Sequence, residues 1–222
     1  MFVVTAMVFA VVVVLSGMYL AQLLSERIDQ TYQHNDIIAH QVLLATRSAL
    51  ERGMVVYPQA ANDPVALRAA MVTVLHSDVA LQQLLNSVIR YSPTVYDVTI
   101  ADDNGKSLVS TDPAIQDQAV PARASFQALQ DANPWRQFRT VFGPPAVYNI
   151  GLSLNRNNVP LLTVRIGVRT SFLRSEMAPW LQAELAIIFL ALMASILLAA
   201  LLSNMALRPL QVISDRLDQF ML

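Results

Sequence analysis

The amino-acid sequence predicts an α+β domain carried between two membrane-spanning helices. Residues 2–24 and 185–207 contain no charged side chain. Each stretch has about 23 residues, and about 20 apolar residues suffice to cross a bilayer. The segment between them shows helical periodicity first and strand-type alternation with tight-turn signals afterwards. Helices followed by a run of antiparallel strands are typical of the α+β class with a single sheet.

The two apolar stretches divide the chain into four parts. We expect a transmembrane helix at 2–24, a water-soluble domain at 25–184, a second transmembrane helix at 185–207 and the start of a further helix at 208–222. The first stretch is longer than the apolar core of about 7–15 residues that signal peptides use, and no basic residue precedes it. We therefore interpret it as a retained anchor.

The flank of the second apolar stretch predicts the orientation. Arg208 and Arg216 follow this stretch closely, and short basic flanks stay on the cytoplasmic side of a membrane. The C-terminus is then cytoplasmic, and two spans return the N-terminus to the same side. The domain between the spans is predicted to be extracytoplasmic.

Composition and motifs argue against several functions. The net charge of −1 gives no electrostatic reason to expect nucleic acid as a partner, and the absence of cysteine excludes disulfides and thiolate metal sites. His34 and His40 are six positions apart, so they do not share the helix face that a metal-binding pair needs. The sequence around Ser153 lacks the second glycine of a nucleophile elbow. We predict no catalytic residue, no metal and no cofactor in this chain.

The first apolar stretch is predicted to continue as a helix into the domain. No proline or glycine occurs between Met18 and Arg52, and apolar residues keep helical spacing as far as Ala49. Gly53 and Pro58 end the pattern. Such a helix suits either of two roles: a rigid rod that carries displacement to the membrane, or a plain packing helix.

The remaining elements follow from capping, turn and strand signals. Asp63-Pro64 and Ser77-Asp78 predict two helix starts, and Asp102-Asp103-Asn104-Gly105 predicts the turn of a hairpin. A short helix is expected to end at Asn133-Pro134. The predicted helices are 65–75, 79–90 and 122–131, and the five predicted strands are 94–101, 106–110, 138–142, 147–154 and 161–169.

This order of elements resembles the extracytoplasmic PAS-like sensor domains of bacteria, of the single-Cache type. The most telling local match is the hairpin at 95–112, VYDVTIADDNGKSLVSTD, in which a strand, an acidic-Asn-Gly turn and a second strand end in Ser-Thr-Asp. The resemblance implies an extracytoplasmic PAS-like domain with a five-stranded antiparallel sheet and a long N-terminal helix.

The residues after the second apolar stretch resemble the first helix of a HAMP linker, a signal-relay element. They combine a proline near the membrane with an apolar seam that steps by three and four, which is coiled-coil spacing. The resemblance implies a parallel homodimer. The relay residues that it implies are Pro209, Leu210, Ile213, Leu217 and Phe220.

The family resemblance also implies a ligand pocket, between the sheet and the helix and loop that precede the third strand. Aromatic walls with guanidinium groups suit a small carboxylate or an amphipathic metabolite. The ligand-binding residues implied in this way are Arg123, Trp135, Arg136, Phe138, Tyr148 and Asn149.

Together, these features resemble the input half of a bacterial receptor in the inner (cytoplasmic) membrane, most commonly a sensor histidine kinase of a two-component system. The chain would detect a small extracytoplasmic solute and pass the signal through its second span. Residues 1–222 contain no catalytic motif, so the sequence leaves the enzymatic output open. Two alternatives remain: a dimerisation or partner-docking platform without a small ligand, and a membrane-anchored envelope protein.

Overall fold

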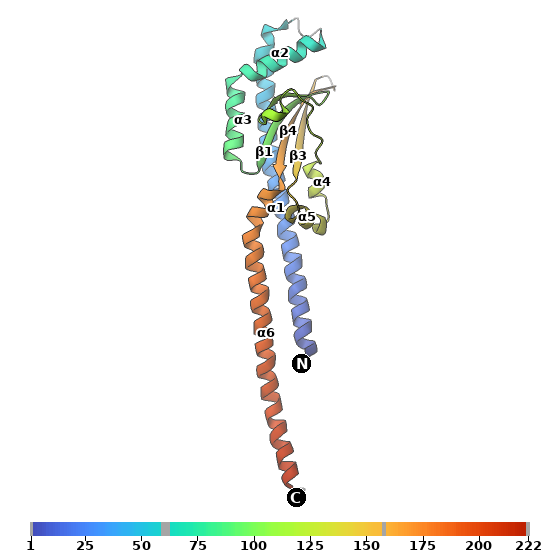
Figure 1. Ribbon diagram of the computed structural model, residues 1–222, viewed down its shortest axis with the longest axis vertical. Helices are drawn as coiled ribbons and strands as arrows, with labels where there is room; N and C mark the ends of the chain where they lie inside the picture. The colour runs from blue at the N-terminus through green and yellow to red at the C-terminus, as the bar shows by residue number, and fades with distance from the viewer. Residues whose placement is uncertain (1, 59–62, 157–158, 221–222) are drawn as a thin grey trace. The chain divides into compact units, whose positions relative to one another are not determined.

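The computed structural model describes residues 2–58, 63–156 and 159–220. The chain forms two compact units, Leu24–Ser175 on the one hand and Met1–Leu23 with Glu176–Leu222 on the other. Helices α1 (Phe2–Gly53) and α6 (Thr170–Phe220) each belong to both units as one continuous helix (Figure 1).

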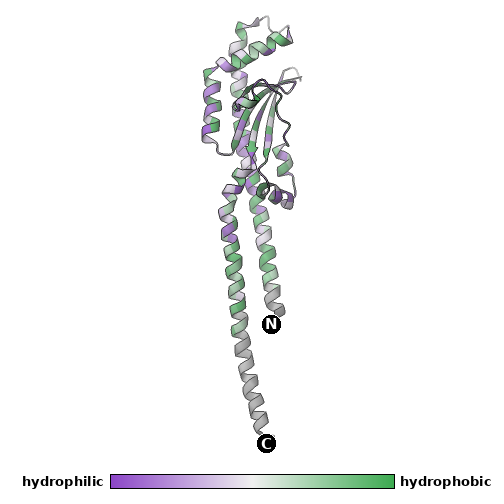
Figure 2. Ribbon diagram, in the orientation of Figure 1, coloured by the Kyte–Doolittle hydropathy of each residue, from purple (hydrophilic) through white to green (hydrophobic). Residues whose placement is uncertain are grey.

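Two helical stretches of the described chain, Phe9–Val56 and Thr170–Leu197, are long enough and contain a window apolar enough to cross a membrane. In Figure 2 the coloured part of α1 nearest the N-terminus and the middle of α6 are mostly green, the colour of hydrophobic residues. Large apolar side chains such as Leu15, Phe189 and Leu190 are more than half exposed, which suits a lipid environment better than water. The backbone of the implied relay residues is helical within α6, but their side chains lie outside the described part of the structure: Pro209, Leu210, Ile213, Leu217 and Phe220.

From Leu24 onward, α1 buries one side only. The prediction of an uninterrupted helix as far as Gly53 is confirmed. The buried Asn35 side chain on this side makes two hydrogen bonds: it donates to the Thr31 carbonyl at 2.8 Å and accepts from Thr94 at 3.1 Å. The buried residues of this side, apolar and polar together, recur every three or four positions, as a core-facing stripe requires. The apolar ones are Leu24, Ile28, Ile38, Ala39, Val42, Ala49 and Leu50, and the polar ones are Thr31, Asn35 and Thr46.

The sheet has four antiparallel strands in the order β2-β1-β4-β3. The predicted hairpin is confirmed, and Gly105 in its turn has a φ of 73°, which glycine adopts without strain. The strands are β1 (Val95–Asp102), β2 (Ser107–Ser110), β3 (Val147–Arg156) and β4 (Val159–Arg169).

The two faces of the sheet differ in polarity. Ile100 pairs with Val164 and Val98 pairs with Ile166 on one face, and all four side chains are buried. This apolar face packs towards α1: Phe126 of α4 (Phe126–Gln130) stacks on Tyr32 of α1 and meets Tyr148 of β3 edge-on. The opposite face carries polar residues, and it forms the candidate site described below.

The prediction of five strands is wrong, because residues 138–142 belong to helix α5 (Pro134–Phe142). Aromatic and β-branched residues suggested a strand here. Asn133 instead accepts a hydrogen bond from the Arg136 amide at 2.8 Å, and Pro134 occupies the first helical turn. The expected helix at 122–131 is shortened to α4, and the residues before it run alongside β3 through a parallel bridge between Ser125 and Asn149.

Helices α2 (Pro64–Ser77) and α3 (Val79–Tyr91) confirm the predicted helix starts. Asp63 caps α2 by accepting from the Val65 amide at 3.0 Å. Asp78 caps α3 by accepting from the Leu81 amide at 2.9 Å. Short 3₁₀ turns occur at Met54–Val56 and Pro113–Ile115.

Asp78 also joins the end of α1 to the α2–α3 junction. Arg52 of α1 donates to the Asp78 carboxylate at 2.7 Å. This hydrogen bond, followed by that from the Leu81 amide, lowers the pKa of the Asp78 carboxyl. Because the native carboxyl then binds a proton less readily than the unfolded one, the stabilisation is complete above the unfolded pKa and is lost as pH falls through the native value.

We predict that Asp78→Ala lowers the free energy of unfolding by about 1 kcal/mol through the lost cap, plus up to about 1 kcal/mol for the exposed ion pair. Asp78→Asn keeps a cap acceptor and removes the charge, so its deficit relative to wild type should shrink on acidification below about pH 4. Thermal unfolding of the full chain in detergent, followed by circular dichroism, measures both effects. Asp63→Asn is the matched control, because Asp63 caps a helix without an ion pair to any described residue. A deficit of Asp78→Asn that does not change with pH would contradict the assignment.

Candidate functional site

A buried ion pair lies on the polar face of the sheet. Arg123, from the segment between β2 and α4, donates through Nη1 to both carboxylate oxygens of Asp97 at 2.7 and 2.9 Å. Only 4% of the Asp97 side chain and 15% of the Arg123 side chain are exposed. A charge buried to this extent is tolerated because its partner lies against it.

Gly167 makes room for this pair. It lies on β4 directly opposite Asp97 in the strand register. A Cβ at this position would collide with the Asp97 carboxylate and would lie 2.7 Å from Arg123 Nη1. The missing side chain therefore lets the carboxylate and the guanidinium meet above the β4 backbone.

Three further side chains complete what we call the Asp97–Arg123 cluster. Asn149 of β3, which is also opposite Gly167, accepts from Arg123 at 3.4 Å. The Tyr96 ring lies 4.1 Å from the Arg169 guanidinium and 5.8 Å from that of Arg123. The cluster thus links β1, β4, β3 and the segment before α4 through charge, hydrogen bonds and cation–π contacts.

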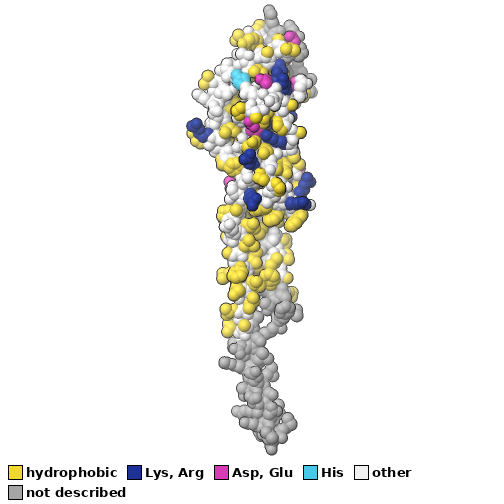
Figure 3. Space-filling view, in the orientation of Figure 1, with side chains coloured by type: hydrophobic (Ala, Val, Ile, Leu, Met, Phe, Trp, Pro, Cys, Tyr) yellow, Lys and Arg dark blue, Asp and Glu magenta, His cyan; other side chains and the backbone are white. Residues whose placement is uncertain are grey.

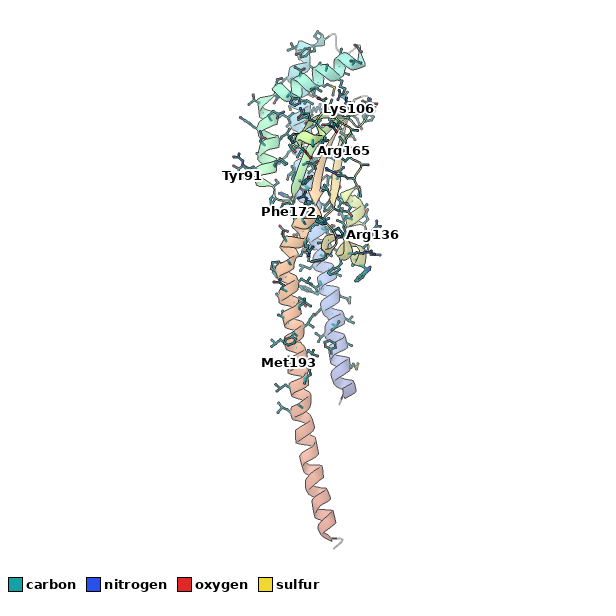
Figure 4. The ribbon with its side chains drawn as sticks, viewed as in Figure 1. Tyr91, Lys106, Arg136, Arg165, Phe172 and Met193 are labelled. Atoms are coloured by element: carbon teal, nitrogen blue, oxygen red, sulfur yellow. The ribbon has the colours of Figure 1, made fainter. Side chains whose placement is uncertain are left out.

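The polar face continues along the strands away from the cluster. Thr99 and Ser110 share a hydrogen bond of 3.0 Å between β1 and β2, and Ser153 and Thr163 share one of 3.3 Å between β3 and β4. Arg165 lies between these pairs, opposite Thr99, and it forms no ion pair with the described residues (Figure 4). Lysine and arginine side chains are visible over this part of the domain in Figure 3. The face presents hydroxyl groups and guanidinium groups.

A groove lies between α3 and the edge strand β2. Its volume is about 840 Å³, within the range of pockets that hold small molecules. Figure 4 shows Tyr91 at the end of α3 that borders it. Ser110 connects the groove to the polar face, since its hydroxyl bonds to Thr99. The polar side chains that line it include Gln82, Gln83, Asn86, Arg90, Tyr91 and Ser110.

The side chains of this α3–β2 groove are suited to binding a polar ligand. Its lining holds amides, hydroxyl groups and one guanidinium, and it holds no carboxylate. Amides and hydroxyl groups bind neutral polar groups, and a guanidinium adds a preference for an anion. Within the described ranges there is no group of three or more side chains that could hold a metal ion.

The residues implied by the family resemblance fall into three places. Arg123 and Asn149 meet in the Asp97–Arg123 cluster, where the guanidinium is engaged by Asp97. Tyr148 faces the other side of the sheet, against Phe126. Residues Trp135, Arg136 and Phe138 lie on α5 and are exposed. The α3–β2 groove is lined by none of these six.

Sequence reasoning missed Asp97, Gly167 and Arg90. One signal for Asp97 was present: a lone charge within the apolar strand pattern at 95–101 marks a position that faces a partner. Gly167 carried a weaker signal, as a glycine within a strand often marks a close approach. Arg90 had none, because its role depends on where α3 packs.

The chain matches no protein-family model, and a search of the curated proteins finds no match.

We predict that Gly167→Ala separates the Asp97–Arg123 pair and destabilises the domain by about 3–5 kcal/mol, the usual cost of breaking a buried pair. Gly151→Ala is the matched control on the neighbouring strand, since a Cβ there meets only the Thr163 methyl group at 4.0 Å. Thermal unfolding of both full-length variants in detergent compares them. Equal melting temperatures for the two variants would show that the pair does not depend on Gly167.

Proposed function

We propose that this protein is the input module of a bacterial membrane receptor, a sensor of a small extracytoplasmic solute that signals through α6. In this proposal α1 and α6 anchor the domain in the inner membrane, and the α3–β2 groove receives the solute. The coiled-coil spacing after the second apolar stretch supports a homodimer.

The observation that carries the proposal is the direct joint between the sheet and α6. Strand β4 is a central strand, paired with β1 on one side and β3 on the other. It ends at Arg169, and α6 begins at the next residue, Thr170. Thr170 is held by Ala146 through two hydrogen bonds, of 2.9 and 3.1 Å. A shift of β4 therefore moves the first turn of α6 without a flexible linker in between.

A chain of contacts connects the α3–β2 groove to this joint. Ser110 at the groove bonds to Thr99 on β1, and Thr99 pairs with Arg165 on β4. Arg165 lies five positions before the start of α6 along the strand. A solute shifts a receptor only by binding one state more tightly than the other. A solute that draws α3 and β2 together would favour one position of β4.

We predict that a solute found by thermal-shift screening of the full chain in nanodiscs binds through Arg90. Arg90→Gln should weaken binding at least about tenfold, since a hydrogen bond to a charged group contributes about 1.5–3 kcal/mol. Arg136→Gln is the control, because Arg136 belongs to the pocket implied by the family resemblance and lies outside this groove. Isothermal titration measures both. Loss of binding in Arg136→Gln alone would place the solute elsewhere, and a screen without any hit would contradict solute sensing.

A second candidate function, a dimerisation platform, is favoured by the exposed side of α1. Ile37 and Leu44 are 58% and 62% exposed and lie seven positions apart, so they occupy the same side of the helix. Isolated exposed apolar residues are common, but this pair follows the heptad spacing of a helix–helix seam. Two copies of α1 packed along this seam would form a parallel dimer.

The chain has no cysteine, so single substitutions test this seam directly. Leu44→Cys is expected to form a disulfide-linked dimer under mild oxidation in nanodiscs. Val65→Cys, which is 77% exposed on α2 and outside the seam, should remain monomeric on a non-reducing gel. Equal cross-linking of the two variants would indicate random collision and contradict the α1 dimer.

A further inference from the structure

Helix α5 exposes aromatic side chains that the domain core does not use. Trp135 is 73% exposed and Phe138 is 38% exposed. The Trp135 and Phe138 rings stack with centroids 6.3 Å apart, and Phe138 lies 4.6 Å from Phe142. At positions 135, 138 and 142, the three rings share one side of the helix. Exposed tryptophan and phenylalanine grouped in this way mark an interaction surface.

The opposite side of α5 fixes the helix to the domain. Gln137 is buried, and its amide donates to the Leu129 and Gln130 carbonyls at 3.3 and 3.0 Å. Its carbonyl accepts from the Ser25 hydroxyl of α1 at 2.7 Å. Val141, one turn further, is also buried. The aromatic rings therefore project from a helix whose position is set by α1.

The attachment point lies at the end of the first apolar stretch. Ser25 follows directly after residues 2–24, the stretch of α1 without a charged side chain. If that stretch crosses a bilayer, its last residue lies at the boundary between lipid and water. The hydrogen bond from Ser25 then holds α5 at the depth of the lipid headgroups.

The charged residues of α5 are of the kind expected at the depth of the lipid headgroups. Arg136 and Arg139 are exposed, and α5 contains no acidic residue (Figure 4 labels Arg136). Neither arginine forms an ion pair with the described residues. Tryptophan and phenylalanine beside arginine are the composition of helices that lie in the membrane interface, where anionic headgroups attract the basic residues.

We propose that α5 is an interfacial anchor, whose Trp135, Phe138 and Phe142 rings insert into the bilayer surface. This inference depends on the proposed membrane anchoring of α1 and is independent of solute sensing. A second copy of the chain fits this surface less well: at 1.5 Å per residue α5 is only about 14 Å long, and a stable interface buries about 800 Å² on each partner. A lipid surface has no such minimum area.

Tryptophan fluorescence tests the proposal, because Trp135 and Trp180 are the chain's two tryptophans. In the full-length Trp180→Phe variant, Trp135 is the sole reporter. The variant is placed in nanodiscs of phosphatidylcholine and phosphatidylglycerol, with acyl chains brominated near the carbonyl end or left unbrominated. We expect the brominated lipid to quench most of the Trp135 emission, and the emission to lie to the blue of that of an exposed indole. Replacing Arg136 and Arg139 with Gln should reduce this quenching.

Two matched reporters, each in a Trp135→Phe/Trp180→Phe background, separate the possible failures. Phe9→Trp lies within the first apolar stretch and should be quenched if α1 is embedded in lipid. Val55 is exposed and lies in the 3₁₀ turn after α1, beyond a helical stretch of about 42 Å from Ser25 to Gly53, so Val55→Trp should not be quenched. If Phe9→Trp is quenched and Trp135 is not, the anchor proposal is overturned while membrane anchoring stands. If Phe9→Trp is not quenched, both proposals fail.

Discussion

The constraint on which the structure depends is that one uninterrupted helix, α1, meets two different surroundings. Residues 2–23 carry no charged side chain, and from Leu24 one side of the helix is buried in the domain. A helix can make this change because its backbone hydrogen bonds are satisfied internally, in lipid as in water. The rest of the domain packs against the buried side of α1 that begins at Leu24. The apolar face of the sheet and the ring of Phe126 both pack towards α1.

The other face of the sheet is held together by charge. Asp97 and Arg123 lie in the interior, and each would be costly there without the other. Their contact requires the bare backbone at Gly167, three positions before α6 begins. The pair therefore joins the strands at the end of the sheet that leads into α6. In the proposed receptor, rigid coupling at this point would transmit a small displacement that a flexible joint would absorb.

Capping, turn and periodicity patterns in the sequence predicted most elements of the fold. They failed at one segment, where a strand-type pattern and a helix-start pattern pointed to different structures. The caps at Asp63 and Asp78 and the turn at Gly105 depend on neighbouring residues, and all three formed as expected. At 138–142, strand-type composition competed with the helix start at Asn133. The helix prevailed because its cap and its buried Gln137 supply hydrogen bonds locally, whereas a strand needs a neighbour in the sheet.

By itself, the sequence determined the apolar segments, the long first helix, the hairpin and the helix caps, because each is encoded by residues a few positions apart. The tertiary structure decided which polar groups meet. Asp97 and Arg123 are separated by 26 positions, and Ser25 and Gln137 by 112. Such contacts depend on strand register, helix packing and the space left by a single missing Cβ, and these are set only when the whole domain has packed.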